Sequence, residues 1–398
     1  SSNYKMSFKN LIKKKLGKNY YKFRLSYILN SLFGEIYISS RKKFKNLSSK
    51  FNFLKKKLNK KVEHQKIIQK ESGFLIDATR DNYLTYHLRP KNSENFNLES
   101  TCKINEKIAI IIQGPIQEKF IFLKNTLNIY KKIFRNSIII VSTWENEDKN
   151  LINSLKDENI FILFSNEPQN KTLFNIDHQI ISTNKALKFA QEKGIKYSLK
   201  TRADIRIHKN NLETFLISLI KTFPVKKNSL INSRIIVPSL ITFKYRLYSL
   251  SDIVLFGETG DLLKYFKNES FKDGLKMFGL DETNLVKNFT PVVAEIFLCS
   301  RLIKNITGQV FWSLEDWWNS LRDYFCIIDN SALDLFWYKY DWDYEYRFLR
   351  TYSDKFSRAI DFQDWLSLYN NLENNWHLAS SEYEKYDDQL KLTNIFKN

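Results

Sequence analysis

The residues from Arg202 to Arg206 combine two guanidinium groups with one carboxylate in the spacing Arg-x-Asp-x-Arg. They come directly after Tyr197–Thr201, a short run with the character of a buried strand. A guanidinium binds phosphate through paired hydrogen bonds, and a carboxylate at a strand end can hold a divalent cation. The pattern indicates leaving-group chemistry on a phosphate ester, in which Lys200, Arg202 and Arg206 offset the phosphate charge. Asp204 is then a catalytic residue and candidate metal ligand, or alternatively the structural ion-pair partner of Arg202.

Short apolar runs rich in β-branched residues predict strands at 107–112, 137–141, 159–164, 196–201 and 252–256. Apolar residues at helical spacing predict the intervening helices, at 120–134, 175–194 and 259–267. Asn175 is a candidate N-cap of the second helix, and Gly194 ends it. This alternation predicts an α/β fold with a Rossmann-like, mostly parallel sheet flanked by helices.

Ligands of such sheets bind at the carboxyl ends of the strands, and polar residues follow several of the predicted strands there. Gln113, Gly114 and Pro115 fit a tight turn that lets the backbone approach a nucleotide, or alternatively a turn that is only structural. Thr143 and Trp144 follow the second strand and could cover a nucleotide base. All five are therefore candidate residues for binding a nucleotide, which in a group transfer would be part of the donor substrate.

The remaining site candidates lie on helices and loops. Gln179 projects from the first half of its helix towards the same edge and is a candidate nucleotide contact, whereas His178 fits a helix cap better than a catalyst. Glu295 lies in an otherwise apolar helical stretch, where burial can raise its pKa towards that of a general base. Asp252 and Asp281 are the alternatives for that base.

Four blocks occur in a fixed order: IIIQGPI (110–116), VSTWENE (141–147), NIDHQIISTNKALKFA (175–190) and KYSLKTRADIRI (196–207). On these blocks the chain resembles, over roughly residues 105–345, the WavE-type lipopolysaccharide synthesis family of bacterial glycosyltransferases. The resemblance implies a nucleotide-sugar-binding catalytic domain of the GT-A type that acts on surface polysaccharide.

GT-A enzymes often carry Asp-x-Asp at the metal site, where this chain has Asp204-x-Arg206. This departure leaves two alternatives for the donor diphosphate. Either Mg²⁺ or Mn²⁺ on Asp204 neutralises it, or Arg206 replaces part of what the cation does.

Charge and composition divide the chain into three predicted regions. Residues 1–104 form a basic helical arm, residues 1–70, and a polar connector, residues 71–104. The catalytic domain is predicted at 105–310, and an aromatic-rich acceptor or lid region at 311–398. The net charge is +20, and the arm carries clusters such as Lys13-Lys14-Lys15 among apolar residues. Such a segment suits an anionic membrane surface, although a solvated Lys-rich extension is the alternative. RNA-binding signatures are absent, which argues against a nucleic-acid partner.

The three cysteines, Cys102, Cys299 and Cys326, have no C-x-x-C spacing and suit a reducing compartment. No signal pattern or long apolar run occurs, and the expected location is the cytoplasm, peripheral to the inner membrane.

The predicted function is transfer of a sugar from a nucleotide-sugar donor to a lipopolysaccharide or capsular polysaccharide acceptor. Two alternatives remain at this point. One is a non-catalytic carbohydrate-binding protein of polysaccharide assembly, and the other is a metal-independent CMP-sugar transferase, in which extra basic residues serve a monophosphate leaving group.

Overall fold

The structure is a computed structural model that describes residues 74–76, 83–85, 106–168, 172, 175–278, 294–340 and 359–371. The chain divides into two units, residues 1–89 and 90–398. In the first unit β1 (Phe74–Ile76) and β2 (Tyr83–Thr85) pair in antiparallel fashion. The basic arm predicted for residues 1–70, and Asp281, lie outside the described residues.

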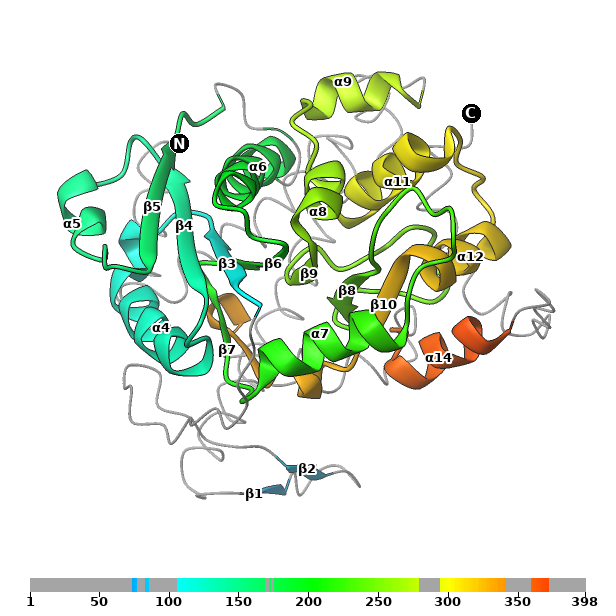
Figure 1. The fold of residues 1–398 in the computed structure, drawn as a ribbon, viewed down its shortest axis with the longest axis horizontal. Helices are drawn as coiled ribbons and strands as arrows, with labels where there is room; N and C mark the ends of the chain where they lie inside the picture. Colours follow the sequence, from blue (N-terminus) through cyan, green and yellow to red (C-terminus); the bar gives the residue numbers. More distant parts are fainter. Residues whose placement is uncertain are drawn as a thin grey trace, which may run out of the picture. The chain divides into compact units, whose positions relative to one another are not determined.

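The second unit is built on a seven-stranded sheet with the strand order β10-β8-β9-β6-β3-β4-β5 (Figure 1). Its strands are β3 (Ile108–Gln113), β4 (Ile138–Trp144), β5 (Ile160–Ser165), β6 (Tyr197–Arg202), β8 (Ile235–Pro238), β9 (Leu255–Glu258) and β10 (Phe325–Ile328). Every neighbouring pair is parallel except the two pairs that include β9. The mostly parallel sheet predicted from the sequence is therefore confirmed.

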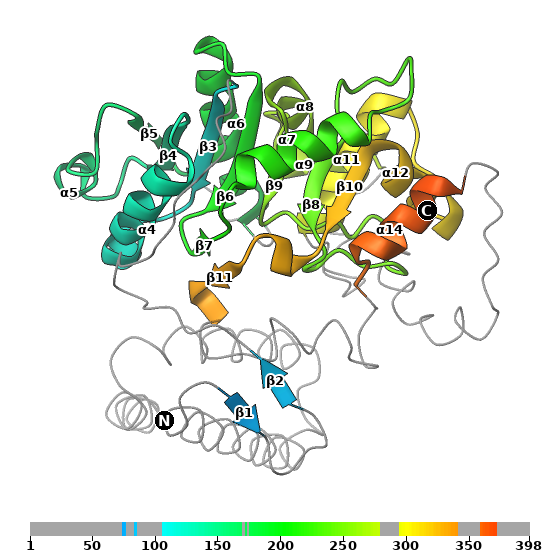
Figure 2. The same cartoon turned by 60° about the horizontal axis from the view of Figure 1, so that its bottom comes forward.

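Helices cover both faces of this sheet. They are α4 (Phe120–Ile133), α5 (Lys149–Asn153), α6 (Ile176–Glu192), α7 (Leu212–Thr222), α8 (Thr259–Tyr265), α9 (Phe271–Lys276), α11 (Ala294–Thr307), α12 (Leu314–Tyr324) and α14 (Phe362–Asn370). Short 3-10 turns are η1 (Gln117–Lys119), η3 (Asn330–Ala332) and η4 (Tyr338–Tyr340). In Figure 1, α6 and α8 lie above the sheet and α4 and α7 lie below it, and Figure 2 brings α4 and α7 to the front.

The strands form where the sequence predicts them because their side chains are buried on both faces. All residues of β3 and β4 are buried, as expected for inner strands of a sheet covered by helices. Asn175 occupies the N-cap position of α6 with φ 55°, but its side chain makes no capping hydrogen bond. Asp177 in the first turn instead accepts from the backbone N–H of Phe271, at 2.6 Å, and so ties α6 to the start of α9.

Two predicted boundaries differ from the structure. The strand predicted at 252–256 is β9, which begins only at Leu255, so Asp252 lies in the preceding loop. The predicted boundary at residue 310 does not divide the fold, because β10 comes from beyond it and pairs with β8 at the edge of the same sheet.

A second, two-stranded sheet follows β6 immediately. Here β7 (Ile205–Ile207) pairs in antiparallel fashion with β11 (Leu335–Trp337), a strand from a distant part of the chain. Trp337 lies opposite Ile205 in this register. This small sheet brings the residues after β11 next to the end of β6.

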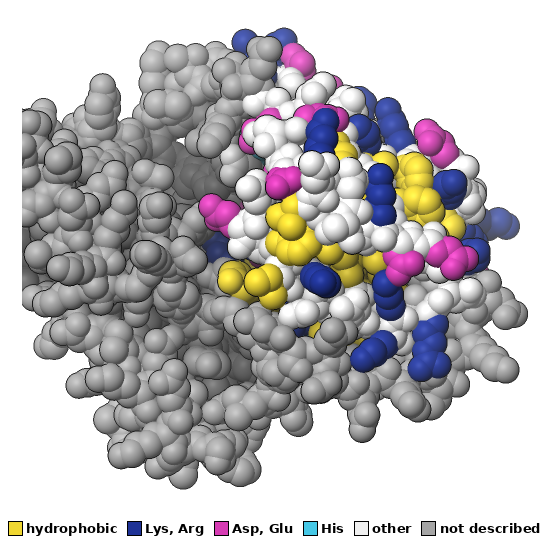
Figure 3. Space-filling view, turned by 90° about the vertical axis from the view of Figure 1, so that its left-hand side faces the viewer, with side chains coloured by type: hydrophobic (Ala, Val, Ile, Leu, Met, Phe, Trp, Pro, Cys, Tyr) yellow, Lys and Arg dark blue, Asp and Glu magenta, His cyan; other side chains and the backbone are white. Residues whose placement is uncertain are grey.

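The edge strand β5 lies on the left-hand side of Figure 1, and Figure 3 shows that side with lysines and arginines spread among apolar side chains. The ammonium groups of Lys149 and Lys193 lie over the rings of Phe164 and Phe161, at 5.6 and 5.5 Å from their centroids. Lys149 belongs to α5 and Lys193 is the C-cap of α6, so both reach β5 from neighbouring helices. Within the described part of the chain, no helix combines the length and apolar character that crossing a membrane requires.

Candidate active site

The order of strands reverses direction between β3 and β6, because β4 and β5 lie on one side of β3 and β6 lies on the other. Ligands of open α/β sheets bind at this kind of switch point. Gln113 and Arg202 are paired in the register, and the N–H of Ala203 donates to the carbonyl of Gln113 at 2.9 Å. Gly114 turns the chain after β3 with φ +118°, a conformation that L side chains rarely adopt, and its N–H donates to the carbonyl of Ser142.

Asp204 lies just beyond β6 and is held on both carboxylate oxygens. Arg202 donates from Nε to Oδ1 at 2.8 Å and from Nη2 to Oδ2 at 3.1 Å, and Trp337 donates from Nε1 to Oδ2 at 3.1 Å. The backbone N–H of Tyr338 donates to the carbonyl of Asp204. Asp204 is only 4% exposed, so these contacts fix its position and its charge.

The electrostatic balance keeps Asp204 ionised. Burial alone raises the pKa of a carboxyl group, but the charge and hydrogen bonds of Arg202 outweigh burial and hold the pKa of Asp204 well below its usual range. The charge of Lys119 and the hydrogen bond from Trp337 act in the same direction. Asp204 is therefore a fixed negative charge at neutral pH.

A second polar group surrounds Asp252 in the loop before β9. Gln179 of α6 donates from Nε2 to Oδ2 of Asp252 at 2.8 Å, and the buried ammonium of Lys200 donates to the backbone carbonyl of Asp252. Asp252 is 6% exposed and Lys200 is fully buried. Gln179 and Lys200, predicted as donor contacts, thus position the Asp252 loop on the sheet.

Two groups near Asp252 have pKa values displaced towards neutrality. Burial lowers the pKa of Lys200 to about 7, and the charge of Asp252 only partly opposes this. Burial and the charge of Asp252 raise the pKa of Glu295, in the first turn of α11, to about 7, against the opposing charges of Arg246 and Arg202. A carboxyl group that titrates near neutral pH suits proton transfer.

Arg206 does not join the predicted phosphate-binding set. Its guanidinium is buried and donates to Thr126 Oγ1 at 2.9 Å and to the carbonyl of Phe122 at 3.0 Å, both on α4. It also stacks over the ring of Phe122. We therefore remove Arg206 from the candidate site, because its side chain serves the packing of β7 against α4.

Thr143 and Trp144 are also placed differently from the prediction. The strand β4 runs on to Trp144, so both residues lie inside it and are buried. The hydroxyl of Thr143 donates to Glu147, whose carboxylate also accepts from the N–H of Ile116 at 2.7 Å. Trp144 packs edge-on against His178. These contacts hold the turn after β3 in shape and leave neither residue to cover a base.

Four further residues act on Asp204, Arg202 or Glu295 and were not predicted from the sequence: Trp337, Lys119, Lys339 and Arg246. Trp337 belonged to the aromatic clusters of the C-terminal region, but nothing in its spacing indicated pairing beside Asp204. Lys339 follows β11 in η4, and burial and the nearby charge of Arg202 lower its pKa. Of the other predicted donor contacts, Pro115 is exposed next to Gly114. The described residues contain no cluster of three or more histidine, cysteine or acidic side chains that could hold a metal ion.

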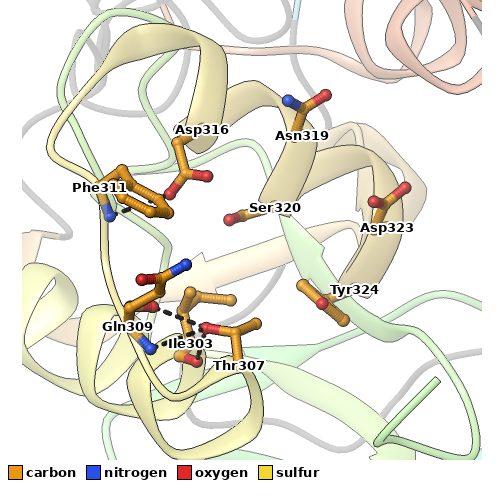
Figure 4. A pocket seen from close by; sticks show the side chains of 9 residues that line it. All are labelled: Ile303, Thr307, Gln309, Phe311, Asp316, Asn319, Ser320, Asp323 and Tyr324. Carbon is orange, nitrogen blue, oxygen red and sulfur yellow. Dashed lines mark hydrogen bonds between the residues drawn. The ribbon is translucent and has the colours of Figure 1, made fainter.

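A cavity of about 230 Å³ lies apart from these residues, between α11 and α12 (Figure 4). Phe311 is 54% exposed at this cavity, and Gln309, Asp316 and Tyr324 also line it. The carboxylate of Asp316 accepts from the hydroxyl of Tyr248 and, at 3.3 Å, from the N–H of Phe311. None of the predicted catalytic or donor-binding residues contributes to this cavity.

Comparison with known families matches residues 108–391 to the family described as WavE lipopolysaccharide synthesis. The chain belongs to this family. The matched range includes the whole seven-stranded sheet and the residues around Asp204, Asp252 and Glu295. As a WavE family member, the protein is assigned to lipopolysaccharide synthesis.

No curated protein matches this chain. Among solved structures, HddC from Yersinia pseudotuberculosis is similar with a TM-score of 0.27 and 9% identity, over 42% of this chain and 83% of that chain. A mannose-1-phosphate geranyltransferase from Thermus thermophilus is similar with a TM-score of 0.23 and 11% identity, over 50% of this chain and 70% of that chain.

Proposed function

We propose that the protein is a glycosyltransferase that moves a sugar from a nucleotide-sugar donor to a lipopolysaccharide or capsular polysaccharide acceptor. One observation carries this proposal. Arg202 and Asp204 form a permanently ionised pair at the switch point of a mostly parallel sheet. The charge of Arg202 also acts on Glu295, whose pKa is about 7. The family assignment and this sheet together support a donor domain of the GT-A type.

The donor half of the site is proposed at the turn after β3 and the end of β6. Gly114 leaves room beside the backbone, since an added side-chain carbon there would meet no atom within 4 Å. Asp204 is placed to hold the guanidinium of Arg202 in position, and Arg202 to bind phosphate oxygens. A nucleotide diphosphate leaving group carries charges that this side of the site can offset.

The acceptor half needs a base that removes a proton from the attacking hydroxyl. In the proposed reaction the acceptor oxygen forms a bond to the anomeric carbon of the donor sugar, and its proton passes to Glu295. The bond between that carbon and the phosphate oxygen breaks, and its electron pair leaves with the nucleotide. Arg246, whose charge counteracts the raised pKa of Glu295, would help to keep the base ionised.

The acceptor chain is proposed to contact the region from residue 311 onwards. The cavity between α11 and α12 supports this, because it joins the exposed ring of Phe311 to the polar groups of Gln309 and Asp316. An aromatic face next to hydrogen-bonding groups suits a sugar ring. Attachment to an anionic membrane surface through the basic residues of 1–70 stays a prediction from the sequence.

Thermal unfolding with UDP, GDP, dTDP and CMP, each with and without Mg²⁺ or Mn²⁺, tests the function. A ligand at about 100 times its dissociation constant adds roughly 2.7 kcal/mol to the free energy of unfolding. We expect one nucleotide to raise the melting temperature and its sugar conjugates to support transfer. Stabilisation by polysaccharide alone, with no response to any nucleotide, would instead favour the non-catalytic carbohydrate-binding protein.

A further inference from the structure

We propose that Lys119, Arg202 and Lys339 form an anion site that neutralises the donor phosphates without a divalent cation. This inference rests on the proposed function, because it names the groups that bind the leaving nucleotide at the same site. The sequence predicted Lys200, Arg202 and Arg206 as the phosphate-binding cations and left the metal on Asp204 open, whereas this site adds Lys119 and Lys339 and needs no metal.

Asp204 does not fit the role of a metal ligand. Its two carboxylate oxygens already accept three hydrogen bonds, two from Arg202 and one from Trp337, and the residue is 4% exposed. A cation such as Mg²⁺ needs carboxylate oxygens that point to an open, hydrated position. The guanidinium and the indole N–H occupy that side of Asp204.

In an Asp-x-Asp pattern, a second carboxylate would stand two residues after Asp204. That position is Arg206, which is buried and donates to Thr126 and to the carbonyl of Phe122. The chain therefore offers neither an open first ligand nor a second acidic ligand at this strand end. A cation placed here would also face Arg202 at close range.

Lys119 and Lys339 lie in two short 3-10 turns. Lys119 ends η1, the short turn between β3 and α4, and its charge acts on Asp204. Lys339 lies in η4, one residue after Tyr338, whose N–H donates to the carbonyl of Asp204. Both lysines are half-buried. Lys119 comes six residues after the end of β3, and Lys339 comes two residues after the end of β11.

Positive charge is in excess near Asp204. Arg202 and Lys119 act on the carboxylate of Asp204, and the charges of Arg202 and Lys119 also act on Lys339, where Asp204 and Glu295 oppose them. Like charges brought together in a partly buried site repel, unless an anion balances them. A phosphate or diphosphate group supplies that balance with oxygen acceptors for each cation. The ligand class is therefore the phosphate part of a nucleotide, held by side-chain cations.

The test is isothermal titration of the full chain with UDP, GDP, dTDP, CMP and inorganic pyrophosphate, in EDTA and in Mg²⁺ or Mn²⁺. We expect one nucleotide to bind equally well in both buffers. Lys119→Gln and Lys339→Gln should each weaken its binding about tenfold, since each removes a hydrogen bond to a charged group. Lys119→Arg should retain most of the affinity.

Two exposed lysines serve as matched controls, Lys124 on α4 and Lys209 after β7. Lys124→Gln and Lys209→Gln should bind as the wild type does, and melting curves should show that all variants fold. Binding that disappears in EDTA, or lysine variants that bind like the controls, would overturn the anion site. Pyrophosphate binding in EDTA without binding of any nucleotide would support the anion site and overturn the proposed function.

Discussion

The charge of Arg202 acts on both Asp204 and Glu295, yet the surroundings of these two carboxyl groups shift their pKa values in opposite directions. Asp204 is paired with Arg202 and Trp337, which hold its pKa well below the usual range. Glu295 is raised to a pKa of about 7 by burial and by the charge of Asp252. Environments that separate the pKa values of two acids assign them different roles.

The comparison extends to the basic groups beside each acid. Arg202 is paired with Asp204 and carries a permanent charge, whereas burial lowers the pKa of Lys200 to about 7. One side of the neighbourhood thus has fixed charges that suit binding of an anion. The other side has groups that gain or lose a proton near neutral pH, which suits chemistry on a hydroxyl group.

The largest effect is expected from Glu295→Gln, which removes the carboxyl group whose pKa is about 7. Loss of a general base lowers kcat by roughly 10²- to 10⁴-fold. The wild-type rate should rise with pH through about 7, as Glu295 loses its proton, and the variant should lack this limb. The measurement is kcat/KM against pH, with Glu315→Gln as the control because Glu315 is an exposed residue in the first turn of α12. A variant that keeps the wild-type limb would show that another group is the base.

A smaller effect is expected from Asp204→Asn, which removes the fixed charge. The rate should fall by about 10²-fold at every pH at which the wild type is active, because Asp204 is ionised throughout that range. The free energy of unfolding should fall by about 1–3 kcal/mol, since Arg202 loses its buried partner while Trp337 can still donate to the amide oxygen.

Urea unfolding as a function of pH checks the origin of that loss. A carboxyl group with a lowered pKa contributes stability above its unfolded pKa of 3.8 and loses it as the pH falls. The difference between wild type and Asp204→Asn should therefore shrink on acidification below about 4. A difference that stays constant down to that range would mean that the Arg202–Asp204 pair is not its source.

The sequence predicted the sheet well, because continuous β-branched runs are characteristic of strands covered on both faces. The predicted strand at 196–201 is β6, and Arg202 and Asp204 lie at its carboxyl end. One error occurred where a strand was longer than its apolar run. Thr143 and Trp144 continue β4 with buried polar and aromatic side chains, so they lie within the strand that they were expected to follow.

The partners of Asp204 could not be predicted for a different reason. Trp337 and Lys339 reach the site through the pairing of β11 with β7, which joins segments more than a hundred residues apart. A three-residue strand has too little periodicity to indicate its partner or register. Arg206 lies on β7 in the same small sheet, and its guanidinium donates to Thr126 and to the carbonyl of Phe122 on α4.

An effect on stability, without a change in the reacting groups, is expected from Lys200→Met. A lysine whose pKa falls from 10.5 to about 7 on folding destabilises the folded state at pH 7 and below, and the loss is recovered as the pH rises to 10.5. The difference in free energy of unfolding between wild type and variant should change by about 1 kcal/mol per pH unit in that window. Urea unfolding measures it, and a difference independent of pH would show that Lys200 stays charged.

The smallest effect is expected from Phe311→Ala, at the cavity between α11 and α12. Phe311 is 54% exposed, so its removal should hardly change the free energy of unfolding. If a sugar of the acceptor packs on this ring, KM for the acceptor should rise by about two- to fivefold, while nucleotide binding stays unchanged. Leu230→Ala is the control, because Leu230 is 62% exposed and is not among the residues that line the cavity. Initial rates at varied acceptor concentration decide the matter. Equal KM values for the two variants would show that the acceptor does not bind at the cavity. The reacting site would then consist of the groups around Asp204 and Glu295 alone.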